Sequence, residues 1–269
     1  AVAEFKSSRF WVASNGGSHV RGPSGISKIE AFNAVRLGRF ISNARAYDND
    51  CFLIYVTEKG NFIDIPASHF AKTAFWFYNK KDKSKGNAAL NLQPIEGLKQ
   101  GRSMQDIEAE IGPIQQLFVK SFNKNAKSKV YYALKKEAGN EYSVYKGRQI
   151  AIPARNKLAA LQCILDTAHS IPSCTMPANI EDVIYFGDDE NDVECLKKCK
   201  ISVARGEQAS DTVKKFAKFK LNNLAEFAEN LYSGKYNDLL FNDSIKKDTA
   251  ARVVDEETSK APEEVIASK

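Results

Sequence analysis

Short apolar runs alternate with amphipathic segments between residues 156 and 218, and this alternation restricts the possible folds more than any other feature. Residues 156–169 carry leucine and isoleucine at spacings of three and four, which is typical of a helix with one buried face. The run 183–187 is apolar and ends in glycine, as a buried parallel strand does. The series continues with a helix over 191–200, a strand over 201–204 and a helix over 210–218. We therefore expect an α/β fold with a parallel sheet.

The chain before residue 150 has a different pattern of predicted elements, which includes two hairpins. The strand pairs are 51–57 with 62–65 and 142–145 with 149–152, each flanking a turn that contains glycine. A helix over 106–111, a strand over 117–122 and a helix over 128–136 are expected between the hairpins. We therefore expect an inserted α+β domain over 20–148 beside a core formed by 1–19 and 149–241. Residues 79–103 are expected to form an exposed loop, and residues 242–269, which lack an apolar period, a disordered tail.

The composition predicts a soluble, cytoplasmic protein. No apolar run approaches the roughly 20 residues that a membrane span needs, and the first residues contain no secretory leader. Five cysteines without dense spacing indicate reduced thiols. Cys195 and Cys199, four residues apart, could form half of a metal site, but no second Cys or His pair accompanies them. We therefore interpret them as ordinary helix residues.

The net charge of +6 is unevenly distributed. Residues 241–269 hold five basic and seven acidic side chains, so the preceding 240 residues carry +8. The positive net charge of the first 240 residues is compatible with an anionic substrate, with nucleic acid or with solubility alone. Because no segment interleaves aromatic and basic residues in the manner of single-strand binders, we expect no nucleic-acid partner, and we expect no membrane partner either. The partner that we expect is a small phosphorylated metabolite, while the sequence indicates no oligomeric state.

An acidic loop at 187–192 is the strongest local signal for chemistry. Asp188 stands where the predicted strand ends, and Asp192 lies in the first turn of the next helix. Ligands of open α/β sheets bind at the carboxyl ends of strands, and carboxylates there suit Mg²⁺. The alternative is that these residues only cap the helix and complement its dipole. An EF-hand is excluded, because the sixth loop position is Val193 instead of glycine and the twelfth is Cys199 instead of glutamate.

Three ordered segments carry a family resemblance. Residues 184–196 resemble motif IV of haloacid-dehalogenase (HAD) phosphatases, in which Gly-Asp-x-x-Asn-Asp follows an apolar strand. Residues 152–161 resemble the Cof-type motif III segment, in which a lysine opens a helix. Residues 201–214 resemble the following strand, glycine turn and helix start, although Arg-Gly-Glu replaces the usual Met-Gly-Asn. With the Asn-Gly turn in 10–17, the chain is similar to Cof-type (HAD-IIB, C2-capped) phosphatases over about residues 8–232.

The resemblance implies an HAD-like core with a C2-type cap and Mg²⁺-dependent hydrolysis of a small phosphate ester, with sugar phosphates as one candidate class. It implies an aspartyl-phosphate intermediate. Asp188 is then the Mg²⁺ ligand, and Asp192 supports the metal shell. Asn191 and Asn15 contribute to substrate binding. Lys157 neutralises charge on the phosphoryl oxygens, although a lysine in a first helical turn is by itself more often simply solvated.

One component of the family's site is not found in this sequence. The nucleophile motif Asp-x-Asp-Gly-Thr and the motif II Ser/Thr precede the Asn-Gly turn in the family, and the fourteen residues before Asn15 contain neither. Asp48 and Asp50 have the right spacing, but their apolar strand follows them instead of preceding them. We therefore expect a phosphatase fragment whose nucleophile lies upstream. The alternatives are a non-catalytic HAD-like protein that binds a metal, a phosphate or a partner, and a strand supplied by a separate polypeptide.

Overall fold

The computed structural model describes residues 11–22, 25–66, 68–73, 92–95, 103–171, 177, 179–221, 224–235 and 237. The described residues form two compact units, one up to residue 180 together with 190–194, the other formed by 181–189 and the residues from 195 on. Each unit is considered by itself. The expected tail at 242–269, and the expected loop at 79–103 apart from 92–95 and 103, lie outside the described residues.

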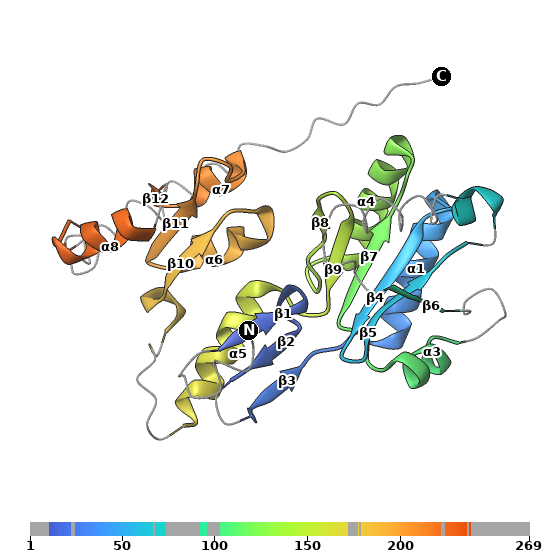
Figure 1. Ribbon diagram of the computed structural model, residues 1–269, viewed down its shortest axis with the longest axis horizontal. Helices are drawn as coiled ribbons and strands as arrows, with labels where there is room; N and C mark the ends of the chain where they lie inside the picture. The colour runs from blue at the N-terminus through green and yellow to red at the C-terminus, as the bar shows by residue number, and fades with distance from the viewer. Residues whose placement is uncertain are drawn as a thin grey trace. The chain divides into compact units, whose positions relative to one another are not determined.

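The first unit contains a six-stranded sheet in the order β6-β5-β4-β7-β9-β8 (Figure 1). All neighbours in it are antiparallel except β5 and β6. Its strands are β4 (Phe52–Thr57), β5 (Gly60–Asp64), β6 (Leu92–Pro94), β7 (Gln116–Lys120), β8 (Tyr145–Lys146) and β9 (Ile150–Pro153). The first predicted hairpin and the strand between the hairpins are confirmed. The second hairpin forms as well, but its first strand is Tyr145–Lys146 instead of 142–145. The pairing of β9 with β7 extends this sheet past residue 148, while the division into cap and core stays a prediction.

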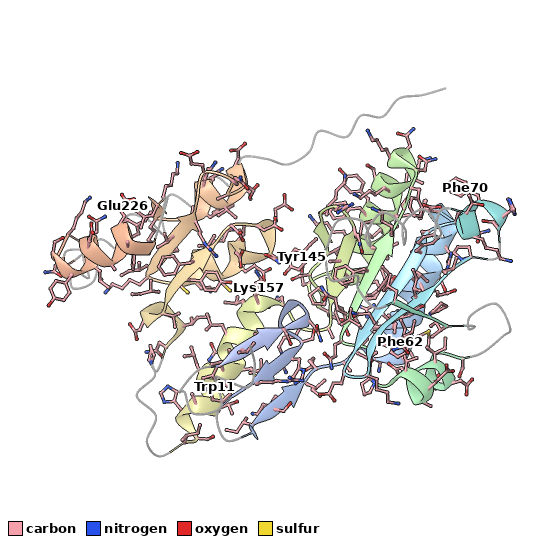
Figure 2. All side chains as sticks on the ribbon, in the orientation of Figure 1. Trp11, Phe62, Phe70, Tyr145, Lys157 and Glu226 are labelled. Carbon is pink, nitrogen blue, oxygen red and sulfur yellow. The ribbon has the colours of Figure 1, made fainter. Side chains whose placement is uncertain are left out.

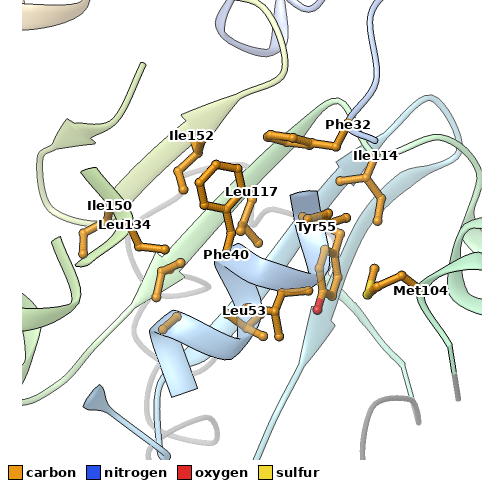
Figure 3. Packing of buried hydrophobic residues seen from close by; sticks show 14 of the residues in the cluster. Phe32, Phe40, Leu53, Tyr55, Met104, Ile114, Leu117, Leu134, Ile150 and Ile152 are labelled. Carbon is orange, nitrogen blue, oxygen red and sulfur yellow. The ribbon is translucent and has the colours of Figure 1, made fainter. Parts of the chain in front are cut away.

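Helices α1 (Ala34–Tyr47), α3 (Met104–Ile111) and α4 (Lys124–Ala138) accompany this sheet. Period-2 alternation sends every second strand residue, such as Leu53 and Tyr55, into one large core with these helices. Figure 3 shows Phe40 of α1 and Leu117 of β7 in this core. The intervening strand residues form a smaller cluster on the opposite face of the sheet, with Phe52, Ile54 and Ile63 as members. Each such side chain contributes about 1.5–3 kcal/mol when it is fully buried.

Helices α3 and α4 match the predictions for 106–111 and 128–136. Helix α1 is not among the predicted elements. The signal for α1 is present: Leu37, Phe40, Ile41 and Ala44 recur at helical spacing and are all buried. Asn33 caps the helix, because its side chain accepts a hydrogen bond from the Val35 N–H at 2.9 Å.

A smaller antiparallel sheet in the same unit joins β1 (Val12–Ser14), β2 (His19–Arg21) and β3 (Ser27–Ile29). Its strand β1 directly precedes the Asn-Gly turn. Helix α5 (Lys157–His169) lies close to this sheet, where Ala160 and Ile164 cluster with Val20 of β2. The helix agrees with the prediction for 156–169.

The second unit contains a parallel sheet in the order β10-β11-β12. Its strands are β10 (Ile184–Gly187), β11 (Ile201–Arg205) and β12 (Phe219–Leu221). Its helices are α7 (Asp211–Phe216), α8 (Leu224–Tyr232) and the part of α6 (Val193–Lys198) from Cys195 on. Ile201 and Val203 of β11 pack with Phe227 of α8 in its core. The expected parallel α/β arrangement is therefore confirmed for this unit. The helix predicted over 191–200 instead starts as a 3₁₀ turn, η5 (Glu190–Asp192), before α6.

Candidate active site

Lys157 is the first residue of α5, and the local sequence fixes it there. Asn156 is extended (φ −81°, ψ 170°), and its side chain accepts a hydrogen bond from the Ala159 N–H at 2.8 Å. This cap satisfies one of the free amides of the first turn. Figure 2 labels the Lys157 side chain at this helix start. The positive end of the helix dipole and the lysine therefore occupy the same place, which favours an anion.

The Lys157 ammonium group is held by two side chains of η5. It donates to Oδ1 of Asp192 at 2.6 Å and to Oδ1 of Asn191 at 2.9 Å. The Asp192 side chain is only 3 % exposed, whereas that of Lys157 is 34 % exposed. The carboxylate therefore holds the ammonium group in place from the protein side while a third of the lysine side chain stays in contact with solvent. Three of the residues expected at the site, from segments more than thirty residues apart, are brought together here.

The contacts of Asp192 bear on its expected place in the metal shell. Its carboxylate is buried and forms an ion pair with a lysine, which supports a role in orienting Lys157. Ligation of a metal by Asp192 stays a prediction.

The Asn-Gly turn packs directly against the start of α5. This turn, η1 (Asn15–Gly17), has three consecutive residues with positive φ, at 53°, 70° and 110°. A Cβ on Gly17 would lie 2.6 Å from the backbone oxygen of Asn156, and one on Gly16 would lie 2.6 Å from Cβ of Pro153. Both glycines are therefore required by conformation and by close approach.

Asn15 contacts a residue that sequence reasoning did not single out. Its amide donates to Oε1 of Gln115, whose side chain is completely buried. The Gln115 backbone is fixed on both sides, because its N–H donates to Val56 and its C=O accepts from Ala154, each at 2.8 Å. No local pattern marks Gln115, since its partner lies one hundred residues away in the sequence. The amide of Asn15 is thus oriented by a residue beside the six-stranded sheet.

Asp188 belongs to the second unit and follows β10 directly. Its side chain is exposed, and its backbone oxygen accepts a hydrogen bond from the N–H of Ser210, the N-cap of α7, at 3.1 Å. The carboxylate thus stands at the carboxyl end of a parallel strand, where ligands of such sheets bind.

The carboxylate chemistry of Asp188 fits Mg²⁺. Within the described ranges, no three His, Cys, Asp or Glu side chains gather into a group that could hold a metal ion by themselves. Mg²⁺ does not require such a cage, because it commonly takes one or two carboxylates and completes its shell with water and substrate phosphate. The Asp188 carboxylate is a hard oxygen donor of the kind that Mg²⁺ accepts.

A family model for haloacid dehalogenase-like hydrolases matches residues 46–228, more than half of the chain, including Lys157 and the loop at 187–192. The chain belongs to the haloacid dehalogenase-like hydrolases. Its motifs place it among the Cof-type members of this hydrolase family. No curated protein matches it significantly.

Solved structures share the fold at low sequence identity. A protein from Eubacterium rectale is 18 % identical, with a TM-score of 0.59, over 86 % of this chain and 78 % of that one. A HAD phosphatase from Bacteroides thetaiotaomicron is 17 % identical, with a TM-score of 0.57, over 81 % and 72 %. A sugar phosphatase of HAD subclass IIB is 14 % identical, with a TM-score of 0.52, over 83 % and 74 %. These similarities establish the HAD-like α/β fold. None of the helices in the described part of the chain has the length and apolar character needed to cross a membrane.

Proposed function

We propose that this chain is a Mg²⁺-dependent phosphohydrolase of small phosphate esters, with sugar phosphates as the first class to test. The observation that carries the proposal is the Lys157 ammonium group, held by Asp192 and Asn191 at the start of α5. Phosphoryl transfer depends mainly on positioning and on neutralising charge, and a fixed, partly exposed cation at a helix N-terminus supplies both. The subclass IIB sugar phosphatase with the same fold supports the choice of substrate class.

Each proposed residue then has a defined task. Lys157 binds the phosphoryl oxygens, and Asp192 keeps its ammonium group oriented. Asn191 and Asn15 hold the substrate through their amides, and Asp188 ligates the Mg²⁺ ion. The metal, when bound, polarises the phosphoryl group and neutralises its charge. Residues 20–148 act as the C2-type cap that selects the substrate.

The residues named above do not include the family's aspartate nucleophile. No Asp-x-Asp-Gly-Thr occurs in the 269 residues. Asp48 and Asp50, which share its spacing, lie just before β4. The N–H of Asp50 donates to Asp48 at 3.2 Å, and the Asp50 carboxylate accepts from the Ser68 hydroxyl at 2.6 Å. These carboxylates stabilise a turn, which supports their exclusion as nucleophiles.

The test separates binding from turnover. Phosphate and Mg²⁺ binding to the chain is measured by titration calorimetry, and hydrolysis of an aryl phosphate is measured with and without Mg²⁺. Lys157→Met is expected to weaken phosphate binding by about tenfold or more, since a charge-assisted hydrogen bond contributes roughly 1.5–3 kcal/mol. Asp188→Asn is expected to weaken Mg²⁺ binding while orthophosphate binding without metal stays intact. Asp211→Asn, an exposed acid in the first turn of α7, is the control and should change neither. Phosphate binding that is unchanged in Lys157→Met would overturn the assignment.

A second candidate is a non-catalytic HAD-like protein that binds a metal, a phosphate or a partner. The lack of the nucleophile motif in these residues favours it. Phosphate and Mg²⁺ binding without hydrolysis of any phosphate ester would support this candidate and exclude catalysis by this chain. We place the protein in the cytoplasm, and the free thiols of Cys51, Cys163 and Cys199 support a reducing compartment.

A further inference from the structure

One flank of α4 carries positive charges that no carboxylate neutralises in the described part of the chain. We name it the basic–aromatic face: Lys127, Tyr131, Tyr132 and Lys135 of α4, with Lys146 of β8 and Arg148 of the turn that follows. Helix α4 and strand β8 lie close together, as Figure 1 shows. Among the described residues, no acidic side chain pairs with these four cations.

Uncharged groups hold the lysines in place. The Lys127 ammonium group donates to the backbone oxygens of Gly147 and Arg148, at 2.7 and 3.2 Å. The Lys146 ammonium group lies 5.2 Å from the ring centroid of Tyr131 and 5.7 Å from that of Tyr132. The Lys135 ammonium group lies 5.9 Å from the Tyr131 ring. These contacts restrict the lysine side chains, but they do not neutralise the ammonium charges, because the contacting groups are uncharged. A surface that is preorganised to bind an anion requires both properties.

The acidic residues of this region face the other flank of α4. Glu137 pairs with Arg36 of α1 at 3.0 Å, and Glu141, in the turn after α4, pairs with the same arginine at 2.6 Å. The Asn43 amide also donates to Glu137, at 3.4 Å. Helix α4 thus separates its charges, with a neutralised flank toward α1 and an unneutralised one toward β8.

We propose that the basic–aromatic face binds single-stranded nucleic acid. Lys127 and Lys135 are eight residues apart on one helix, a span of about 12 Å, and the lysines of the face can contact successive backbone phosphates. The Tyr132 side chain is 66 % exposed and offers a ring surface for one base. A basic track beside exposed aromatic rings is the arrangement that single-strand binders use, and each stacked base contributes about 1–3 kcal/mol.

The sequence predicts no nucleic-acid partner, because no single segment interleaves aromatic and basic residues. The basic–aromatic face forms only in the folded chain. Lys146 and Arg148 come from a segment separate from α4, and the fold places the Lys146 ammonium group over both tyrosine rings. The face does not depend on Lys157, Asn191 or Asp192, so the proposal is independent of the proposed phosphatase function.

Fluorescence anisotropy with the full chain and a labelled 12-nucleotide single-stranded RNA tests the proposal. The double variant K135Q/K146Q is expected to weaken binding by about tenfold at low salt. It should reduce the slope of log affinity against log salt by about 1.4, or about 0.7 for each lost phosphate contact. Tyr132→Ala should weaken binding by about fivefold or more at an unchanged salt slope, and Tyr132→Phe should retain it because the ring remains. The matched control K28Q/K220Q removes two exposed lysines of β3 and β12 and should leave binding unchanged.

Competing partners give different results. No binding at low salt, or equal weakening by K28Q/K220Q, would overturn the proposal. Inorganic polyphosphate of equal length that binds as tightly as RNA, with no effect of Tyr132→Ala, would show a site for phosphate alone. Tighter binding to an acidic peptide or to anionic vesicles than to RNA would assign the face to that partner and reject nucleic acid. Thermal unfolding of each variant confirms that these surface changes leave the fold intact.

Discussion

The Lys157 ammonium group and the Asp192 carboxylate lie 2.6 Å apart, yet only one of the two side chains has access to solvent. The lysine side chain is 34 % exposed and the aspartate 3 %. If the ion pair is broken, the lysine can be solvated by water, whereas the carboxylate stays in a medium of low polarity. The two partners are therefore not equivalent for stability.

Removal of the lysine should destabilise the protein more than neutralisation of the aspartate. Lys157→Met removes the ammonium group that lies 2.6 Å from the buried Asp192 carboxylate and should lower the free energy of unfolding by about 3 kcal/mol. Asp192→Asn keeps a polar acceptor beside a solvated lysine and should lower it by about 1 kcal/mol. Urea denaturation measures both. Asp166→Asn, at an exposed carboxylate that accepts from Gln162, is the control. A larger loss in Asp192→Asn than in Lys157→Met would contradict this account.

Gly17→Ala should disturb the site through the backbone. The residue has a φ of 110°, and the added methyl group would lie 2.6 Å from the Asn156 oxygen at the start of α5. Strain and clash together should lower the free energy of unfolding by about 2–4 kcal/mol. Gly139→Ala is the matched control, because Gly139 also has a positive φ, 55°, but has open space around it. Its loss should be about 1 kcal/mol, and equal losses in both variants would show that the contact with Asn156 is unimportant.

The sequence predicts those parts of the fold in which a periodic pattern is strong and local. The strands β4, β5 and β7 and the helices α3, α4 and α5 follow from apolar period and turn chemistry. Helix α1 is not among the predicted elements, although its buried residues recur at helical spacing. Gly38 lowers its helix propensity. The predicted helix over 191–200 includes Asn191 and Asp192 of η5, because these polar residues carry no apolar signal that separates 3₁₀ from α geometry.

The site is predictable only where family motifs mark it. Lys157, Asn191 and Asp192 come from such motifs, and the structure brings them into contact. Gln115 has no motif, and its contact with Asn15 depends on the tertiary placement of segments one hundred residues apart. A single sequence carries no signal for a contact of this kind.

Tyr55→Phe should stabilise the protein or leave it unchanged. The Tyr55 side chain is fully buried in the main core, and its hydroxyl group has no hydrogen-bond partner among the residues that the structure describes. Burial raises the pKa of this phenol well above its ordinary value, so it stays neutral at all working pH values. Removal of an unsatisfied buried hydroxyl should raise the free energy of unfolding by about 1 kcal/mol. Urea denaturation checks this value, with Tyr132→Phe on the surface as the control. Destabilisation by more than 1 kcal/mol would indicate that the hydroxyl has a partner.

His19 should make stability depend on pH below neutrality. Its side chain is buried, and its Nε2, when unprotonated, accepts a hydrogen bond from Arg21 at 3.1 Å. The Ser27 hydroxyl lies 2.9 Å and Oε1 of Glu58 3.7 Å from the same nitrogen. Burial lowers the pKa of His19 below 6.5, and Arg21 lowers it further, while Glu58 acts in the opposite direction.

The sign of the pH effect follows from this depressed pKa. Below pH 6.5 the unfolded chain binds a proton that the folded chain does not bind. The free energy of unfolding should therefore fall as the pH falls from 6.5 toward the folded-state pKa, by at most about 1.4 kcal/mol per pH unit, and His19 should contribute no slope above 6.5. Urea midpoints between about pH 5 and pH 8 measure this. The difference in the free energy of unfolding between the parent and His19→Gln should shrink on acidification. A difference from His19→Gln that stays constant or grows as the pH falls would mean that His19 is protonated in the folded protein.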